Sequence, residues 1–167
     1  MSKYFKKSLF MLCILFIINF TACTTETASE VESFCREYKI KLYNITDYNA
    51  FDKTQIFQET DKIDNEFKDY FTQSGLSLFK GLRLSTKYKL AAYNQKYNMR
   101  LVKLELTKDY ENEKDNMAGY NYIASIKISS LGKEDKTVFD KGYFNMIKKN
   151  GKWKLIVDKI DSSFLDN

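Results

Sequence analysis

Histidine is absent from this chain of 167 residues, and cysteine occurs only three times. Without histidine, the protein lacks the usual general base, the Ser-His and Cys-His nucleophile pairs and the commonest metal ligand. The sequence also contains no Gly-rich phosphate loop, no Cys-x-x-Cys pair and no paired-acid metal motif. We therefore expect no catalytic residue, no bound metal and no cofactor.

The N-terminus has the composition of a secretory signal. Lys3, Lys6 and Lys7 supply positive charge without any acid, and an apolar run from Leu9 to Phe20 follows. A helix of about 12 residues rises about 18 Å, whereas a membrane-spanning helix must cross a hydrocarbon core of about 30 Å. The run is too short for a permanent membrane span, so we predict a cleaved leader.

The leader ends in Phe20-Thr21-Ala22-Cys23, which resembles the lipobox of bacterial lipoproteins. The resemblance implies a signal peptide over residues 1–22, cleavage between Ala22 and Cys23, and a diacylglycerol on the Cys23 thiol. Two acyl chains hold a protein on a bilayer, at about 0.8 kcal/mol per buried methylene. We therefore expect a lipid-anchored protein on the outer, extracytoplasmic face of the cell membrane. The alternative is an ordinary secretory signal in which Cys23 is incidental.

Cysteine use fits this anchor. Cys13 leaves with the leader and Cys23 carries the lipid, so Cys35 remains alone and the mature protein forms no intramolecular disulfide. Cys35 lies on the apolar face of a predicted helix, where we expect a small buried side chain rather than a reactive thiol. Residues 23–29 form a lipidated polar tether that spans at most about 20 Å.

Charge argues against a nucleic-acid partner. The formal net charge of the whole chain is +5, but three of its 27 basic residues lie in the leader. The mature chain then carries 24 basic and 22 acidic residues, a net charge of only +2. A dedicated nucleic-acid binder would concentrate positive charge.

Helical periodicity dominates the first half of the mature chain. Ser29 begins a capping box, and apolar residues recur at helical intervals from Val31 to Ile45. The pattern also predicts a short helix from Thr46 or Asp47 to Phe51, a third from Thr60 that Ser74-Gly75 ends, and a further turn or two up to Ser85. Residues 30–160 are predicted to form a single domain, followed by a C-terminal tail over residues 161–167.

From Tyr88 onward the period changes to two, which predicts β-strands. Val102, Leu104 and Leu106 alternate with polar residues, and every second residue from Tyr120 to Ile128 is apolar. Charged or turn-forming loops separate the strands at residues 111–116 and 132–136. The second half of the chain is therefore predicted to be a sheet.

The last hairpin is marked by Asn150-Gly151, because this pair readily supplies the two positive φ angles of a type I′ turn. The two-residue loop pairs Lys149 with Lys152, Lys148 with Trp153, Met146 with Leu155 and Phe144 with Val157. The last two pairs share one apolar face, and Asp158 is predicted to lie on the opposite face. Lys148 over Trp153 is a cation–π pair in this register, worth about 0.5–1 kcal/mol.

Helices followed by an antiparallel meander predict an α+β fold, in which N-terminal helices pack on a curved antiparallel sheet. The segments Lys68–Thr72 (KDYFT) and Gly142–Leu155 (GYFNMIKKNGKWKL), together with the helical first half, resemble small Gram-positive lipoproteins of the nuclear-transport-factor-2-like superfamily. The resemblance covers about residues 30–159. It implies a cystatin-like cone, in which a curved sheet wraps a long helix beside a pocket, and homodimers through the sheet.

Relatives in that superfamily use Asp, Tyr and sometimes His inside the cone for proton transfer. This chain has no His, and the sheet acids Glu105 and Asp158 are predicted to face outward. An acid needs an apolar pocket to gain the raised pKa that acid–base catalysis at neutral pH requires. We therefore expect no enzyme activity, and a buried acid would favour the opposite interpretation.

Two groups of residues are candidates for binding. Tyr88, Tyr120, Tyr122 and Trp153 are candidates for lining a pocket, although core and rim packing is the commoner role of such aromatics. Lys148, Lys149, Lys152 and Lys154 are candidates for contact with anionic lipid or wall polymer, at about 1 kcal/mol per charge. The alternative for these lysines is a solvated strand face that protects a sheet edge.

These observations favour a membrane-anchored, non-catalytic binding or interaction module. Its membrane contact is the diacylglycerol on Cys23, and its partner is an envelope protein or a small ligand, with homodimerisation through the sheet as a further expectation. One alternative is a small-ligand-binding or enzymatic cone that uses the aromatic pocket. Another is a structural component of an envelope secretion or transfer machine.

Overall fold

The computed structural model describes residues 29–50 and 52–166. The predicted leader, the cleavage site at Ala22 and Cys23, and most of the tether lie outside the described residues. The chain divides into two compact units, Met1–Cys35 and Arg36–Asn167. In the first unit, residues 29–35 are helical, and the predicted burial of Cys35 is confirmed.

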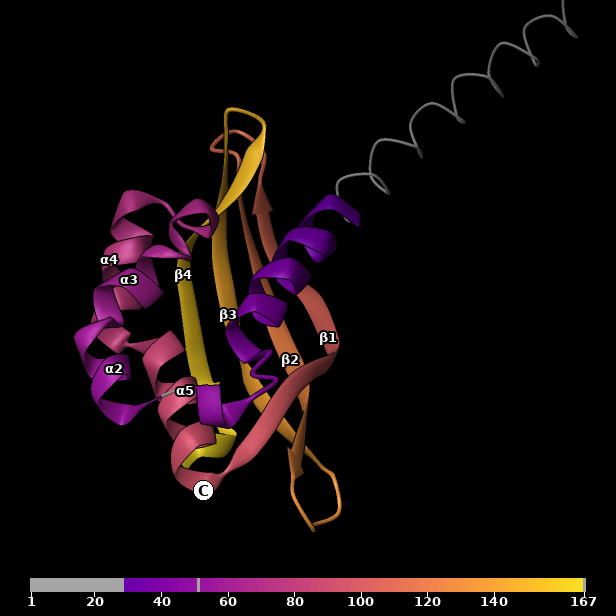
Figure 1. Ribbon diagram of the computed structural model, residues 1–167. Coiled ribbons are helices and arrows are strands. Elements are labelled where there is room, and N and C mark those ends of the chain that lie inside the picture. Colours follow the sequence, from indigo (N-terminus) through magenta and orange to yellow (C-terminus); the bar gives the residue numbers. More distant parts are fainter. Residues whose placement is uncertain (1–28, 51, 167) are drawn as a thin grey trace, which may run out of the picture. The chain divides into compact units, whose positions relative to one another are not determined.

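The second unit combines helices with one antiparallel sheet (Figure 1). The strands are β1 (Tyr97–Asn112), β2 (Met117–Ser130), β3 (Lys136–Lys149) and β4 (Lys152–Ser162), in the spatial order β1-β2-β3-β4. Each strand is antiparallel to its neighbour, so the sheet is a simple meander with β1 and β4 as its outer strands. The predicted fold class, α+β with helices packed on a curved antiparallel sheet, is confirmed.

Helices precede the sheet in the chain. The helix that starts in the first unit continues to residue 43. It is followed by η1 (Tyr48–Ala50), α2 (Lys53–Gln58), α3 (Thr60–Asn65), η2 (Lys68–Tyr70), α4 (Gln73–Leu82) and α5 (Leu84–Gln95), and η3 (Phe164–Asp166) follows the sheet. Figure 1 shows α2 to α5 gathered beside β4.

Two predicted boundaries in the helical half are wrong. Ser74-Gly75 does not end a helix, because Thr72 has an extended backbone and its hydroxyl accepts from Gly75 N–H, which caps the start of α4. Tyr88 does not begin the sheet but lies in α5, and the first strand starts at Tyr97. The buried face of α5 includes the polar residues Ser85 and Thr86, so its sequence lacks a clean apolar stripe.

A β-bulge in β1 changes which residues face the core. The pairing with β2 shifts between Leu101 and Lys103, so the alternation slips by one residue. Leu101 is therefore buried, whereas Val102 is 48% exposed, contrary to the predicted pattern. The predicted outward orientation of Glu105 is confirmed, since its side chain is 51% exposed in an ion pair with Lys103.

The last hairpin has the predicted turn and the predicted register near it. Asn150 and Gly151 have φ angles of 51° and 74°. The pairs nearest the turn are those expected from a two-residue loop: Lys149 with Lys152, Lys148 with Trp153, and Met146 with Leu155. The sequence therefore sets the pairing correctly over this part of the hairpin.

Beyond Leu155 the predicted register is wrong, because β4 contains a bulge at Ile156. The partner of Phe144 is Asp158 instead of Val157. The extra residue reverses the faces of the following positions. Val157 thereby leaves the core face, and Asp158 becomes buried with only 4% of its surface exposed.

Helix α4 packs closely against this bulge. A Cβ on Gly75 would lie 2.5 Å from the Leu155 carbonyl oxygen and 2.9 Å from that of Ile156. Just before the helix, Thr72 N–H donates to the Leu155 carbonyl at 2.9 Å. The missing side chain at Gly75 thus allows α4 to cover the edge of β4 at the point where Asp158 turns inward.

Candidate functional site

Charged and phenolic side chains cluster inside the second unit, between helix residues 36–43 and the sheet. At the centre, the Lys39 Nζ lies 2.9 Å from Asp158 Oδ2, and these side chains are 0% and 1% exposed. We call the whole group the interior cluster. It consists of Tyr38, Lys39, Tyr43, Tyr88, Tyr122, Asp140 and Asp158. Burying two charges costs desolvation, so the surrounding groups must supply further hydrogen bonds.

All three donors of the Lys39 ammonium are engaged. Besides Asp158, it donates to the Tyr122 hydroxyl at 2.9 Å and to the Tyr43 hydroxyl at 3.4 Å. Its nitrogen lies 4.1 Å from the centroid of the Tyr122 ring and between 5.2 and 5.4 Å from three further aromatic centroids. A desolvated cation over an aromatic face gains about 2 kcal/mol. The interior therefore holds a cation that the chain itself provides.

The bulge in β4 brings Asp158 to this cation. Oδ2 also accepts from the Tyr38 hydroxyl at 2.6 Å, and Oδ1 accepts from the Tyr122 hydroxyl at 3.0 Å. Tyr122 thus accepts from Lys39 and donates to Asp158. A carboxylate offers about four acceptor positions, so these intramolecular donors use most of its capacity.

Asp140 is a second buried carboxylate, and its residue is 0% exposed. Its Oδ2 accepts from the hydroxyls of Tyr43 and Tyr88, and its Oδ1 accepts from Phe164 N–H at 2.9 Å. Regular alternation along β3 places Asp140 on the buried face of the strand, since every second residue from 140 to 146 is buried. One carboxylate therefore joins the N-terminal helix, α5 and η3, which are distant in sequence.

Aromatic rings close the cluster toward the helices and the sheet. The Tyr38 centroid lies 5.5 Å from that of Phe71 and 6.5 Å from that of Phe79, both in edge-on geometry. Below them, Tyr122 stacks on Phe144 at 4.5 Å. Edge-on and stacked pairs are the favoured aromatic geometries. This packing keeps the ion pair dry.

Burial raises the pKa of the phenols in the cluster above the ordinary value of 10. The phenols concerned are Tyr38, Tyr43, Tyr88 and Tyr122. Desolvation is the largest cause, and the charge of a nearby carboxylate adds to it in each case. Beside the cluster, desolvation and then the charge of Asp140 raise the pKa of Tyr97 to about 12. The phenols therefore remain hydrogen-bond donors at neutral pH.

Alkaline conditions are expected to unfold the protein through these phenols. Below pH 10 they are neutral in both states, so their contribution is fully present. Above pH 10 the unfolded chain releases protons that the folded chain retains. The unfolding free energy should then fall by about 1.4 kcal/mol per pH unit for each buried phenol. Denaturant titrations on both sides of pH 10, followed by phenolate absorbance, test this. Ionisation of the buried phenols near pH 10 with the fold retained would contradict it.

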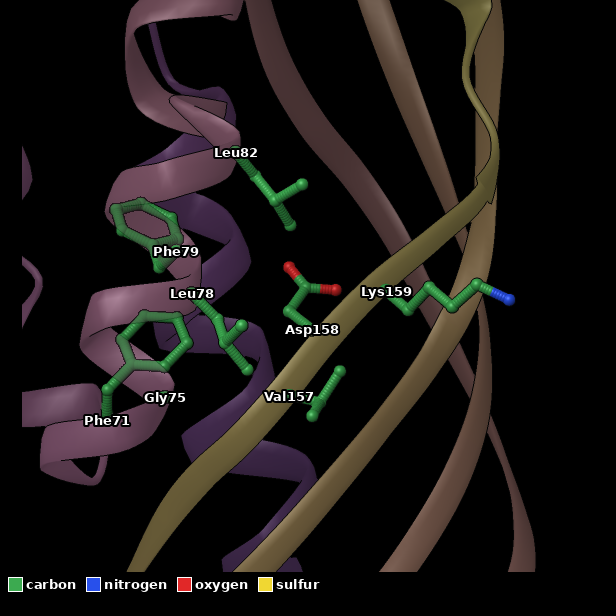
Figure 2. A pocket seen from close by; sticks show the side chains of 8 residues that line it. All are labelled: Phe71, Gly75, Leu78, Phe79, Leu82, Val157, Asp158 and Lys159. Atoms are coloured by element: carbon green, nitrogen blue, oxygen red, sulfur yellow. The ribbon is translucent and has the colours of Figure 1, made fainter.

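A hollow of about 160 Å³ reaches Asp158 from the side of α4 (Figure 2). Figure 2 shows the Asp158 carboxylate directed toward α4, while the Lys159 side chain points away. The walls are mainly apolar and come from α4, from β4 and from the residue that follows η2. They include Phe71, Gly75, Leu78, Phe79, Leu82 and Val157. The hollow thus meets the interior cluster at Asp158, whose oxygens already accept from Tyr38, Lys39 and Tyr122.

The four aromatic pocket candidates all lie in the interior. Tyr88 and Tyr122 belong to the interior cluster, with exposures of 1% and 2%. Tyr120 and Trp153 are buried elsewhere along the sheet, and the hollow beside Asp158 is lined by other residues. The proposed role of these aromatics in ligand binding stays a prediction.

The four lysine candidates gather around the last hairpin. Lys149 and Lys152 flank the turn and are exposed, and Lys148 Nζ lies 5.7 Å from the Trp153 ring centroid, which matches the expected cation–π pair. Lys154 instead donates to the Asp69 carbonyl oxygen. The contact of these lysines with anionic surfaces stays a prediction.

Lys39, Asp140 and Asp158 were not predicted as site residues, and Asp158 lies on the face opposite to the predicted one. The spacing held a signal for the first two. Lys39 lies four residues after Cys35 on the buried helix face, and Asp140 lies on the alternating buried face of β3. The inward orientation of Asp158 depends on the bulge at Ile156, which the alternation does not indicate. Among the described residues, no three His, Cys, Asp or Glu side chains are grouped to hold a metal ion.

Within residues 29–50 and 52–166, no helix is both long and apolar enough to cross a bilayer.

No family model matches the sequence, and no curated protein does. An IcmL-like type IV secretion system protein from Legionella pneumophila aligns with a TM-score of 0.53 and 12% identity, covering 81% of this chain and 94% of that one. The periplasmic domain of DotI gives 0.50 and 12%, covering 81% and 95%. A nuclear-transport-factor-2-like protein with a cystatin-like fold from Novosphingobium aromaticivorans gives 0.46 and 9%, covering 86% and 90%. The first two show that this chain shares their fold.

Proposed function

We propose that this protein is a lipid-anchored, extracytoplasmic and non-catalytic structural component of an envelope secretion or transfer machine. The observation that carries the non-catalytic part is the filling of the sheet interior. Lys39 and the phenols engage the carboxylates that a cone enzyme would offer to a substrate. Such a network stabilises and orients the elements around it.

The role in a machine rests on the shared fold and on the leader. The two structures of the same fold are described as an IcmL-like type IV secretion system protein and as the periplasmic domain of DotI. A signal ending in Ala22-Cys23 would hold this chain on the outer face of the membrane. A domain of this fold, tethered close to the bilayer, is suited to scaffolding and to binding an envelope protein.

Cross-linking in the native membrane tests the proposal. The full-length protein, cross-linked in cells and purified in mild detergent, should carry one stoichiometric envelope partner. The variant Cys23→Ser should remain unlipidated and lose the partner, whereas Cys35→Ser should keep both lipid and partner. Metabolic labelling with a radioactive fatty acid checks the lipid directly. Retention of the partner without lipid, or purification with no partner at all, would contradict the assignment.

The hollow beside Asp158 supports a second candidate, a small-ligand site. The hollow measures about 160 Å³ and has a buried carboxylate at its wall. Leu78 is 54% exposed at its mouth, so Leu78→Trp should fill the hollow without disturbing the interior cluster. Loss of small-molecule binding in this variant, with the envelope partner retained, would separate the two candidates. A fragment screen by NMR on the full-length protein provides the measurement.

A further inference from the structure

A second hollow, of about 290 Å³, lies outside the interior cluster. Its walls come from α2, from α3 and from the end of α4. Phe57, Asp61, Asp64, Lys80 and Arg83 are among the residues that line it. Its lining is mainly polar and carries both signs of charge, in contrast to the apolar hollow beside Asp158. The proposed scaffold role assigns no function to this hollow.

Asp64 lines this hollow and has a buried carboxylate oxygen without a donor in the described part of the chain. The residue is 1% exposed, and its Oδ1 accepts from the Ser85 hydroxyl. Its Oδ2 has no hydrogen-bond partner within residues 29–50 and 52–166. A buried acceptor without a donor is costly and calls for an explanation. Desolvation raises the pKa of Asp64, as expected for a carboxylate in such a place.

Arg83 joins α4 to α5 in a conformation that favours glycine. Its φ and ψ angles are 51° and 39°, and it serves as C-cap of α4 and N-cap of α5 through its backbone. A non-glycine residue in this left-handed region is strained. An arginine here therefore costs stability that a glycine would not, as does Lys96, which has a similar backbone conformation and does not line the hollow.

The charged residues that line the hollow indicate which functional groups a ligand should carry. Arg83 and Lys80 make no ion pair with any described residue. The guanidinium of an arginine matches the geometry of a phosphate. The same two cations would repel a ligand ammonium, so the donor for Asp64 should be a hydroxyl, as Ser85 already is. Asp61 at the wall offers a further acceptor for hydroxyls.

We propose that this hollow is a binding site for a polyol phosphate. The phosphate lies against Arg83 and Lys80, and a ligand hydroxyl donates to Asp64 Oδ2. A volume of about 290 Å³ accommodates a molecule of the size of glycerol phosphate. This chemistry occurs both in free or polymeric glycerol phosphate and in phosphatidylglycerol headgroups. The inference is independent of the scaffold role proposed above.

Calorimetric titration of the full-length protein in nonionic detergent with glycerol 3-phosphate tests the site. Saturable binding with a Kd of about 1 mM or tighter is expected. Inorganic phosphate and glycerol, each lacking half of the contacts, should bind about tenfold more weakly. A short-chain phosphatidylglycerol forms the second arm. Tighter binding of that lipid assigns the site to a headgroup, and tighter binding of glycerol 3-phosphate assigns it to the free or polymeric form.

Lys96 offers a matched control for Arg83. It also has a left-handed backbone, with φ of 55°, and it caps the other end of α5, away from the hollow. Arg83→Gly and Lys96→Gly each remove one positive charge and relieve the same kind of strain. Arg83→Gly should weaken binding about tenfold with a Tm that is unchanged or higher, whereas Lys96→Gly should leave binding unchanged.

Asp64→Asn tests the acceptor separately, because an asparagine keeps the size of the side chain and one oxygen for Ser85. It should weaken binding of glycerol 3-phosphate and leave that of inorganic phosphate unchanged. Three results would overturn the proposal. They are an absence of saturable binding, an equal loss in Arg83→Gly and Lys96→Gly, and tighter binding of zwitterionic alanine than of glycerol 3-phosphate.

Discussion

Replacement of Lys39 by methionine is expected to lower the unfolding free energy by about 3–5 kcal/mol. Methionine fills a similar volume but removes the ammonium that lies 2.9 Å from Asp158. The carboxylate, at 1% side-chain exposure, would then keep only the hydroxyls of Tyr38 and Tyr122 as donors. An uncompensated buried charge of this kind is among the largest single defects that a core can carry. Urea titration followed by circular dichroism measures the loss.

Two further variants test whether the loss arises from the unpaired buried charge. The double variant with Lys39→Met and Asp158→Asn should recover most of the loss, because both charges are then gone. The amide oxygen can accept from one phenol, and the amide N–H can donate to the Tyr122 oxygen that Lys39 no longer occupies. Lys103→Met removes a lysine from the exposed pair with Glu105, whose side chains are 62% and 51% exposed, and should cost at most about 1 kcal/mol. Equal losses in Lys39→Met and Lys103→Met would contradict the role of burial.

The parts of the fold that follow from the sequence are those with local causes. The last hairpin is an example, because the turn at Asn150 and Gly151 and the apolar alternation point to the same register. The apolar face of the first helix is another, since Cys35 and Leu42 occupy predicted helical positions and both are buried. In each case a turn or a period determines the outcome within a few residues.

The interior cluster could not be predicted in the same way. Leu155, Ile156 and Val157 are all apolar, so alternation gives no sign of where the bulge lies, and one extra residue decides which way Asp158 points. Lysine is almost never fully buried, so the position of Lys39 on an apolar helix face suggests an exposed end. The pairing of Lys39 with Asp158 in the folded protein offsets the desolvation cost of burying the two charges.

The pairing also bears on what the buried carboxylates can bind. Each of the two inward carboxylates is engaged by donors from the N-terminal helix. Replacing Lys39 therefore frees an acceptor as well as weakening the fold. A gain of ligand binding in the double variant described above would link the interior cluster to the hollow beside Asp158.

The variant Gly75→Ala is expected to destabilise the protein by about 3 kcal/mol, because overpacking of a rigid contact costs about 1–3 kcal/mol. The new methyl group would lie 2.5 Å from the Leu155 carbonyl oxygen and 2.9 Å from that of Ile156. Both atoms belong to the backbone at the bulge, so no flexible side chain can move aside. Helix α4 must shift away from β4, which also opens the hollow beside Asp158. Thermal and urea unfolding provide the measurement.

Gly81 lies in the same helix and supplies the control. A Cβ there meets no atom within 4 Å, and the residue is exposed. Gly81→Ala should therefore stabilise the protein by about 0.5–1 kcal/mol, through the better helix propensity of alanine. The two substitutions add the same methyl group to α4 and should change stability in opposite directions. A small effect of the same sign in both would mean that α4 does not rest on the bulge. The inward orientation of Asp158 would then require an explanation other than the packing of α4.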